Sequence, residues 1–221
     1  MPIIIRLDGV AFHTLTKAFK RPFSKSFFEL MQETMSYLCT KIPNVVLGYT
    51  QSDEISLFIF YHRRFESEPW FDNRQSKIES VSAGMASCCF GFCYSMINET
   101  LDRVVKPAFF DSRAFVLPEV EVPNYFIWRW KDWVRNSVQM LAQSHFSPKQ
   151  LLCKRIPDIH EMLHDKGINW ATDCDQVEKN GSICYRNSSR VFNIEPAPDD
   201  TEKWRLLIDN ITKNVKTEEA E

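Results

Sequence analysis

Three short apolar runs in the first third of the chain have the character of strands, and acidic residues interrupt them at two points. The first run, residues 3–7, contains three consecutive isoleucines and stops at Asp8-Gly9. β-Branched side chains pack well on a pleated surface, and glycine lets the backbone turn. Residues 45–50 and 55–60 form the other two runs, with Asp53 in the short link between them. The pattern predicts three buried strands, the last two joined as an antiparallel hairpin.

Apolar residues at helical spacing follow the first and third runs. Ser24 is expected to cap a first helix, and a longer helix is expected over residues 73–98. A short fourth strand is expected at residues 114–118. The resulting order, β-α-β-β-α-β, is the ferredoxin-like unit, whose strands lie in the order 4-1-3-2. In that arrangement the end of the first strand and the hairpin share one edge, so Asp8 and Asp53 should be neighbours.

From about residue 124 the composition changes, and aromatic and charged residues alternate up to Trp133. Helices are expected there and at residues 147–150 and 158–164, followed by a short strand at 182–186. We therefore expect an α+β fold in three parts. They are a ferredoxin-like, polymerase-type palm at residues 1–120, a mainly helical region at 121–195 packed on it, and a polar tail at 196–221 with one amphipathic segment.

Composition and charge are those of an ordinary soluble globular protein. Of the 221 residues, 44% are hydrophobic and 25% are charged, and the net charge of −2 gives no overall basic excess. No uninterrupted apolar segment has the length of a bilayer span, and no signal sequence opens the chain, so no membrane partner is expected. The seven cysteines contain no Cys-x-x-Cys pair, which favours reduced thiols in the cytoplasm and argues against a structural zinc.

Asp8 and Asp53 are the main candidates for chemistry. Two carboxylates that converge at a sheet edge repel each other unless a divalent cation neutralises them, and Mg²⁺ with substrate phosphates suits hard oxygen ligands. A pair of such ions would activate an attacking hydroxyl and stabilise a leaving pyrophosphate. Glu54 follows directly, although neighbours on a strand point to opposite faces. Acids are also common in turns, so residue types alone leave both interpretations open.

Two groups of residues could support nucleotide binding. Backbone amides after the first strand, with His13 nearby, could contact phosphate, although a lone Asp-Gly is a weak signal. Lys20 and Arg21 precede a proline, while Arg74 and Lys77 lie one helical turn apart on one face. Cations of this kind can bind a triphosphate or can simply form a solvated charged face.

The segment Trp128-Arg-Trp-Lys-Asp-Trp133, followed by Arg135 and Asn136, interleaves aromatic rings with cations. Such a pattern suits base stacking and phosphate contact with RNA. Several of these tryptophans could equally belong to a helical core. No local signature of a cysteine–histidine or serine–histidine nucleophile accompanies them.

Six motifs together resemble the tRNA(His) guanylyltransferase family in order and spacing, over about residues 3–186. They are Arg6-Leu-Asp-Gly9 with Phe12-His13, Lys20-Arg-Pro22, Gln51-Ser-Asp-Glu54, Arg74-Gln-Ser-Lys77, Phe110-Asp-Ser-Arg113 and Trp128-Arg-Trp-Lys-Asp132. Any one motif is modest, but six in register make the match specific. The resemblance implies a polymerase-like palm that adds nucleotides in the 3′-to-5′ direction, at the 5′ end of tRNA.

Carried over residue by residue, the resemblance implies a metal site, a nucleotide site and a tRNA contact. Asp8, Asp53 and Glu54 would be catalytic, and Asp8, Gly9 and Asp53 would hold two Mg²⁺ ions. ATP, GTP or another nucleoside triphosphate would contact Asp8, Gly9, Val10, Ala11, Phe12, His13, Arg21, Ser52, Asp53, Arg74 and Lys77. The tRNA would contact Arg129, Lys131, Arg135 and Asn136. The resemblance further implies a homotetramer, built as a dimer of dimers.

Two departures from the family pattern narrow this expectation. Eukaryotic members carry a His-Ile-Asn-Asn-Leu-Tyr-Asn motif where this chain has Val134-Arg-Asn-Ser-Val-Gln-Met140. This stretch resembles the bacterial and archaeal branch, which repairs 5′-truncated tRNA against a template. The family also usually has a helical segment ahead of its first strand, and this chain begins almost at that strand, as a shortened protein or one with an upstream start would.

The resemblance therefore implies template-dependent 5′ extension of tRNA, after ATP has activated the 5′-monophosphate. The alternatives are guanylate addition to tRNA(His) alone, and a non-catalytic tRNA-binding protein that has kept the palm. A nucleotide cyclase is a third, because such palms resemble this one. The intact Asp8 and Asp53 argue against loss of turnover, and the Trp128 segment with its downstream helices disfavours a cyclase.

Overall fold

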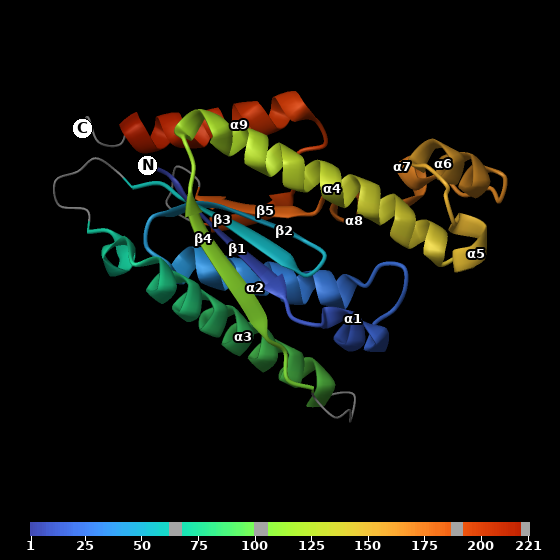
Figure 1. Cartoon of the computed structure of the whole chain (residues 1–221), viewed down its shortest axis with the longest axis horizontal. Coiled ribbons are helices and arrows are strands. Elements are labelled where there is room, and N and C mark those ends of the chain that lie inside the picture. Colours follow the sequence, from blue (N-terminus) through green and yellow to red (C-terminus); the bar gives the residue numbers. More distant parts are fainter. Residues whose placement is uncertain (62–67, 100–105, 187–191, 218–221) are drawn as a thin grey trace.

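The computed structural model describes residues 1–61, 68–99, 106–186 and 192–217, and its centre is a six-stranded sheet (Figure 1). The strands follow the order β4-β1-β3-β2-β5-β6, and every neighbouring pair is antiparallel. Their bounds are β1 Ile3–Gly9, β2 Val45–Gln51, β3 Glu54–Ile59, β4 Phe110–Val116, β5 Ser182–Arg186 and β6 Phe192–Pro196.

The first four strands and the two long helices between them form the predicted β-α-β-β-α-β unit. Helix α2 spans Lys25–Lys41 and helix α3 spans Gln75–Glu99, and strands β1 to β4 have the predicted order 4-1-3-2. As predicted, Ser24 caps α2, because its Oγ accepts a backbone hydrogen bond from the first turn at 3.4 Å. Strand β4 begins at Phe110, earlier than predicted, because Phe110 pairs with Gly9 of β1.

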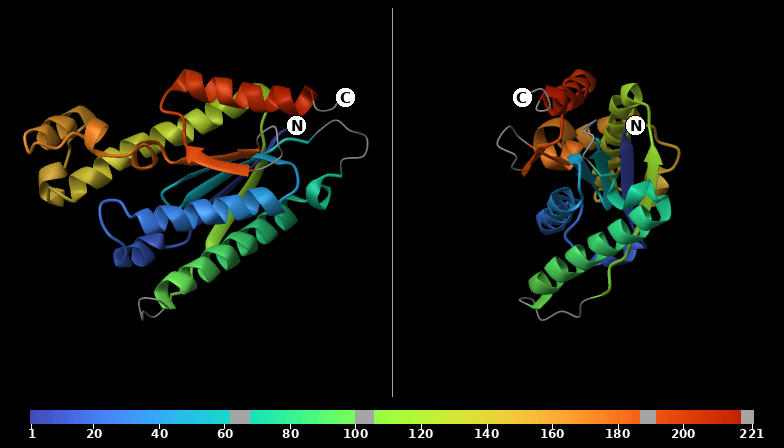
Figure 2. Two further views of the ribbon diagram at one scale, coloured as in Figure 1. Left: turned by 180° about the vertical axis from the view of Figure 1, so that it is seen from behind. Right: turned by 90° about the vertical axis from the view of Figure 1, so that its left-hand side faces the viewer.

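Helices cover both faces of the sheet (Figure 2). Helices α2 and α3 lie on one face, and α4 (Val122–Gln143) and α9 (Thr201–Thr217) lie on the other. Ile5 and Leu7 of β1 join the core under α2 and α3, whereas Ile4 joins the core under α4 and α9. Because side chains alternate along a strand, Arg6 and Asp8 share the face of Ile4. The sheet therefore presents the first acidic candidate on the α4 side.

Helix α9 contains the amphipathic segment expected in the tail at residues 196–221. Trp204, Ile208 and Ile211 recur at helical spacing and are buried. The Trp204 ring stacks on Phe126 of α4 with 5.8 Å between centroids, and it meets Tyr49 of β2 edge-on at 5.1 Å. As its amphipathic pattern predicts, the outer side of the helix carries exposed charged residues, which are Glu202, Lys203, Arg205 and Asp209.

Short helices follow α4, and α5 to α7 form a lobe that projects beyond the sheet in Figure 1. Trp133 of α4 lies in a buried cluster with Leu163 of this lobe. Asn180 ties the chain back to the sheet, since its backbone carbonyl accepts a hydrogen bond from Tyr49 and its side chain accepts one from Trp130, each at 3.0 Å. The bounds are α5 Pro148–Leu151, α6 Ile156–His164, α7 Trp170–Asp173 and α8 Gln176–Asn180, with α1 at Phe12–Leu15 and 3₁₀ turns at Thr16–Ala18, Trp70–Asn73 and Glu119–Glu121.

Strands β5 and β6 extend the palm sheet beyond the predicted palm boundary. The sequence predicts β5 but not β6, and both lie in the region expected to be mainly helical. Ser182 of β5 pairs with Thr50 of β2, and Pro196 of β6 pairs with Ser182. The described part of residues 121–195 therefore contributes two strands to the sheet as well as the helices packed on it.

Helix α3 differs from the expectation that no segment has the length of a bilayer span. Residues Gln75–Ile97 are long and apolar enough to cross a membrane by length and composition alone. One side of α3 packs against α2, β1 and β4, where Ile78, Phe90 and Tyr94 are buried. The other side leaves Phe92 exposed.

Candidate functional site

Two acid-bearing turns meet at one end of the sheet. The backbone N–H of Gly9 donates to the carbonyl of Asp53 at 3.0 Å, which fastens the end of β1 to the turn between β2 and β3. Asp8 lies between Glu54 on β3 and Asp111 on β4 in the strand register. The segments of Asp8 and Asp53 are therefore neighbours, as the strand order predicts.

The backbone at both turns is held in an uncommon conformation. Ala11 has φ of 56° and Ser52 has φ of 48°, so both lie in the left-handed region that non-glycine residues rarely adopt. Gly9 is required for a different reason: a Cβ there would lie 2.4 Å from Cγ of Phe12. The Phe12 ring is itself fixed, with its centroid 5.0 Å from that of Phe110. The edge is therefore shaped by packing before any ligand binds.

Asp8 and Asp53 have no cationic partner among the side chains that the structure describes. Burial, and after it the negative charge of Asp8, raises the pKa of Asp53. No lysine or arginine of the described residues forms an ion pair with either carboxylate. Within the same residues no three His, Cys, Asp or Glu side chains gather as a metal-binding group. Asp8 and Asp53, with the Gly9 carbonyl, therefore fit Mg²⁺, which needs few protein oxygens and keeps water or phosphate on its other positions.

Glu54, predicted to be catalytic, has a different role in the structure. Its carboxylate is buried and accepts from Nε of Arg129 at 2.7 Å and from Nη2 of the same guanidinium at 2.6 Å. Arg6 forms a second ion pair with it at 3.1 Å. Both acceptor oxygens are thus satisfied by cations. The structure thus shows the two side chains buried against each other, and a catalytic role for Glu54 and a tRNA contact for Arg129 stay predictions.

A cavity of about 370 Å³ opens beside Asp53, between α1, α2, the β2–β3 turn and α4. This volume is in the range of small-molecule sites. Lys20 lies on its rim, and among its apolar lining residues are Phe19, Phe23 and Met140. Of the predicted nucleotide contacts, the cavity is lined by Phe12, His13, Arg21, Ser52 and Asp53. Val10 and Ala11 are exposed and do not line it.

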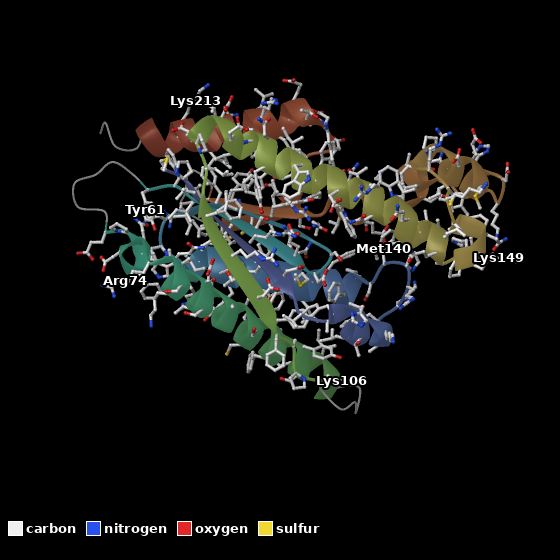
Figure 3. The ribbon with its side chains drawn as sticks, viewed as in Figure 1. Tyr61, Arg74, Lys106, Met140, Lys149 and Lys213 are labelled. Atoms are coloured by element: carbon white, nitrogen blue, oxygen red, sulfur yellow. The ribbon has the colours of Figure 1, made fainter. Side chains whose placement is uncertain are left out.

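Arg74 and Lys77 are predicted to bind the triphosphate. In a single copy of the chain they lie far from this cavity. They sit at the start of α3, beside the opposite end of the sheet (Figure 3). The seven residues of β1 separate the two ends by about 20 Å at the usual rise of a strand. Arg74 and Met140 mark the two ends in the figure. Within one chain these cations and the Asp8–Asp53 edge therefore lie at opposite ends of β1, and their role as triphosphate ligands stays a prediction.

The other predicted tRNA contacts lie on the outside of α4. Lys131 and Arg135 are exposed, and Asp132 accepts hydrogen bonds from Arg135 and from Asn136. The tryptophans of this helix separate into two kinds, which the sequence pattern did not distinguish. Trp130 and Trp133 are buried, whereas Trp128 is exposed. Burial along α4 repeats with the helical period, and that period was the available signal.

A second motif in the chain does not form a site. Helix α6 carries His160, Glu161 and His164 in the His-Glu-x-x-His spacing of zinc-protease helices. A cavity of about 320 Å³ lies beside them, lined also by Trp170. No further His, Cys, Asp or Glu completes a metal-binding group with them in the described part of the chain. The spacing alone therefore does not define a zinc centre here.

Comparison with known proteins places this geometry in a family. Residues 1–118 match the profile of the family described as tRNAHis guanylyltransferase (Thg1). A bacterial tRNA(His) guanylyltransferase-like protein in complex with ATP superimposes with a TM-score of 0.87 at 38% identity, over 96% of this chain and 90% of that one. A bacterial protein of the same description in complex with GTP gives 0.77 at 33% identity, over 96% and 89%.

Curated relatives extend the similarity beyond bacteria. The probable tRNA(His) guanylyltransferase of Homo sapiens is 27% identical over 221 residues, which cover 93% of this chain and 72% of the human protein. The chain spans only 64% of the length of a similar uncharacterized protein of Acanthamoeba polyphaga mimivirus. The fold, the paired aspartates and the matched half of the sequence agree with one another: the chain belongs to the tRNA(His) guanylyltransferase family of nucleotidyltransferases.

Proposed function

We propose that this protein is a 3′-5′ nucleotidyltransferase that adds nucleotides to the 5′ end of tRNA and repairs 5′-truncated tRNA against a template. The observation that carries the proposal is the position of Asp53, which lines a nucleotide-sized cavity together with Lys20 and Arg21. The backbone bond from Gly9 to Asp53 brings the segment of Asp8 beside it. Family membership supplies the reaction class. The ATP and GTP complexes of the two bacterial relatives support nucleotides as the occupants.

In this proposal the cavity holds the activating or incoming nucleotide. Phe19, Phe23 and Phe27 offer apolar surface for a base, and the rim cations offer charge-assisted hydrogen bonds to phosphates. His13 and Ser52 lie on the same lining and can contact sugar or phosphate. The nucleotide thus lies with its phosphates toward the two aspartates, where an in-line displacement needs them.

Asp8, Asp53 and the Gly9 carbonyl would hold the Mg²⁺ ions. Bound Mg²⁺ would neutralise phosphate charge and lower the pKa of an attacking hydroxyl. The chain's own contribution is to keep the two carboxylates together by the backbone bond between Gly9 and Asp53, and to hold the nucleotide next to them. The RNA 5′-monophosphate first attacks the α-phosphate of ATP, which joins AMP to the RNA and releases pyrophosphate. The 3′-hydroxyl of an incoming triphosphate then displaces that AMP.

A second copy of the chain would bring Arg74 and Lys77 to the site. Helix α3 exposes Phe92 and Met96 on its outer side. Phe109, the residue before β4, is also exposed. Two such helices packed antiparallel would cover these apolar side chains. They would also place the start of one α3 beside the end of the other, next to the partner's Asp8 edge. This arrangement would form one of the two dimers in the predicted dimer of dimers and would keep the two cations as triphosphate ligands.

The test is a 5′-extension assay with a 5′-truncated tRNA transcript, ATP, the other nucleoside triphosphates and Mg²⁺. The wild type should lengthen the RNA, and Asp53→Ala should reduce the rate on the order of 10³-fold or more. Asp209→Ala, an exposed acid on α9, is the matched control and should retain activity. No extension by the wild type, or equal extension by Asp53→Ala, contradicts the proposal.

Substrate comparison separates the proposal from its alternatives. Activity confined to full-length tRNA(His), with none on truncated tRNAs, would replace repair by guanylate addition. Tight tRNA binding without pyrophosphate release would replace catalysis by binding alone. Extension that follows the template base opposite each added position supports the repair function.

A further inference from the structure

The part of the sheet formed by β1 and β4 carries exposed side chains on its α4 side. Arg6 pairs in register with Arg113, and Ile4 pairs with Phe115. Ala114 belongs to the core under α2 and α3, so the alternation of β4 directs Arg113 and Phe115 to the opposite face, the face of Asp8. Arg113 is exposed, and no carboxylate of the described residues forms an ion pair with it.

Trp128 of α4 stands at the margin of the same face. It is 54% exposed, although it is a tryptophan in the middle of a helix packed on the sheet. The Arg129 guanidinium lies 4.6 Å from its ring centroid, and Tyr125 lies 6.1 Å from it. Tyr125 in turn meets Phe115 of β4 at 5.7 Å. Trp128 is therefore held by its neighbours while much of its surface remains open.

The charges along this face change from one end to the other. Near Trp128, Arg129 pairs with Glu54 and Asp132, and Arg6 pairs with Glu54. Arg113 is the exposed cation of this end, and it forms no ion pair within the described residues. At the other end are the two acids Asp8 and Asp111. Arg6 lies two residues from Asp8 on one strand, about 7 Å away. A single nucleotide bridges such a distance.

We propose that Arg6, Arg113, Phe115 and Trp128, here termed the Trp128 face, bind an unpaired nucleotide of the RNA substrate. The base stacks on Trp128, and the phosphate that follows it contacts Arg113 and Arg6. The strand then runs toward the negative end of the face, where a divalent cation at Asp8 accepts its terminal phosphate. This inference rests on the proposed function and names the surface that orients its RNA. The exposed Arg113 beside the exposed ring of Trp128 favours RNA over a protein partner, because a cation next to an aromatic ring suits phosphate contact and base stacking.

The test measures binding of a short single-stranded RNA with a 5′-monophosphate by fluorescence anisotropy, without turnover. Trp128→Ala should weaken binding about tenfold, because stacking on an aromatic ring contributes roughly 1–3 kcal/mol per base. Trp128→Phe should retain most of the affinity. Arg113→Gln should weaken binding and reduce the slope of log affinity against log salt by about one. Leu206→Ala, an equally exposed apolar residue on α9, is the matched control and should bind as the wild type does.

Kinetics separate this inference from the proposed function. In the extension assay Trp128→Ala should raise the KM for RNA about tenfold and leave the KM for ATP unchanged. If the wild type extends RNA and Trp128→Ala has an unchanged KM for RNA, the inference is overturned while the function stands. If the wild type binds the oligonucleotide through Trp128 but never extends it, the inference stands without the function. If Trp128→Ala dissociates an oligomer and leaves the RNA affinity unchanged, the Trp128 face is a protein contact and the inference is overturned.

Discussion

Asp53 and Glu54 are neighbours in sequence, yet the structure treats their charges in opposite ways. Glu54 is buried on the sheet beneath α4 and is neutralised by Arg129 and Arg6. Asp53 lies in the turn just before it, beside Asp8, and has no such partner among the described side chains. The comparison separates two uses of a carboxylate. One joins a strand to a helix, and the other leaves negative charge available for a cation from solution.

The largest expected effect concerns Asp8 and Asp53, the two carboxylates without a cationic partner in the described part of the chain. Asp8→Asn or Asp53→Asn should abolish extension activity and should also remove the stabilisation that Mg²⁺ gives to the wild type. Mg²⁺ at a hundredfold excess over its Kd stabilises a folded protein by about 2.7 kcal/mol. Thermal unfolding with Mg²⁺ and with EDTA measures this difference. An equal rise in Tm for wild type and Asp53→Asn would place the metal elsewhere.

Glu54, whose charge is neutralised by two arginines, should matter for the stability of the fold. Arg129→Met leaves Glu54 buried with only Arg6 as its partner, and we expect the free energy of unfolding to fall by about 3–5 kcal/mol. The double variant Glu54→Gln, Arg129→Met should recover part of this loss. The matched control is Arg135→Met, which removes an exposed ion pair with Asp132 and should cost less than about 1 kcal/mol. Urea unfolding measures all three, and equal losses for the two arginines would refute the comparison.

Packing beneath the two turns gives a smaller effect. Gly9→Ala places a methyl group 2.4 Å from the Phe12 ring, and we expect a loss of about 1–3 kcal/mol in stability. Gly84→Ala on α3 is the matched control, because no atom lies within 4 Å of its added methyl group and helix propensity improves. Equal unfolding midpoints for these two variants would contradict the close packing at Gly9.

The smallest effect concerns pH. Because burial and Asp8 raise the pKa of Asp53, the folded chain holds this proton more tightly than the unfolded chain does. Without metal, the stability contributed by Asp53 therefore falls as pH rises from the usual aspartate range through the raised pKa. The free energy of unfolding of Asp53→Asn minus that of the wild type should increase over this window and stay constant above it. Unfolding in EDTA at several pH values measures this difference. A difference independent of pH would contradict a raised pKa of Asp53 in the folded chain.

The palm was predictable because its local signals agree with one another. Three isoleucines, a hairpin and two helices of ordinary length fix both the order of elements and the edge shared by Asp8 and Asp53. The strand order 4-1-3-2 and the neighbouring turns are confirmed. The nature of the metal at these residues stays a prediction.

Other parts depended on tertiary contacts that the sequence pattern does not contain. The sequence pattern predicts Arg129 as a surface cation, because its partner Glu54 lies 75 residues away in the chain. Arg74 and Lys77 look equivalent to Lys20 and Arg21 in composition, and only the direction of α3 assigns them to the opposite end of the sheet. Strand β6, with mostly exposed side chains, has no alternation that would reveal it.

The bond between Tyr49 and the carbonyl of Asn180 joins residues 131 positions apart, and that between Gln32 and Ser182 joins residues 150 apart. The second layer over the sheet therefore forms only after nearly the whole chain has left the ribosome. Until then the α4-facing side of β1, β2 and β3 remains exposed to water and to other nascent chains. Contacts this distant in sequence slow folding and expose apolar strands meanwhile. Residues 1–118, which match the family profile, thus depend during synthesis on the part of the chain that follows them.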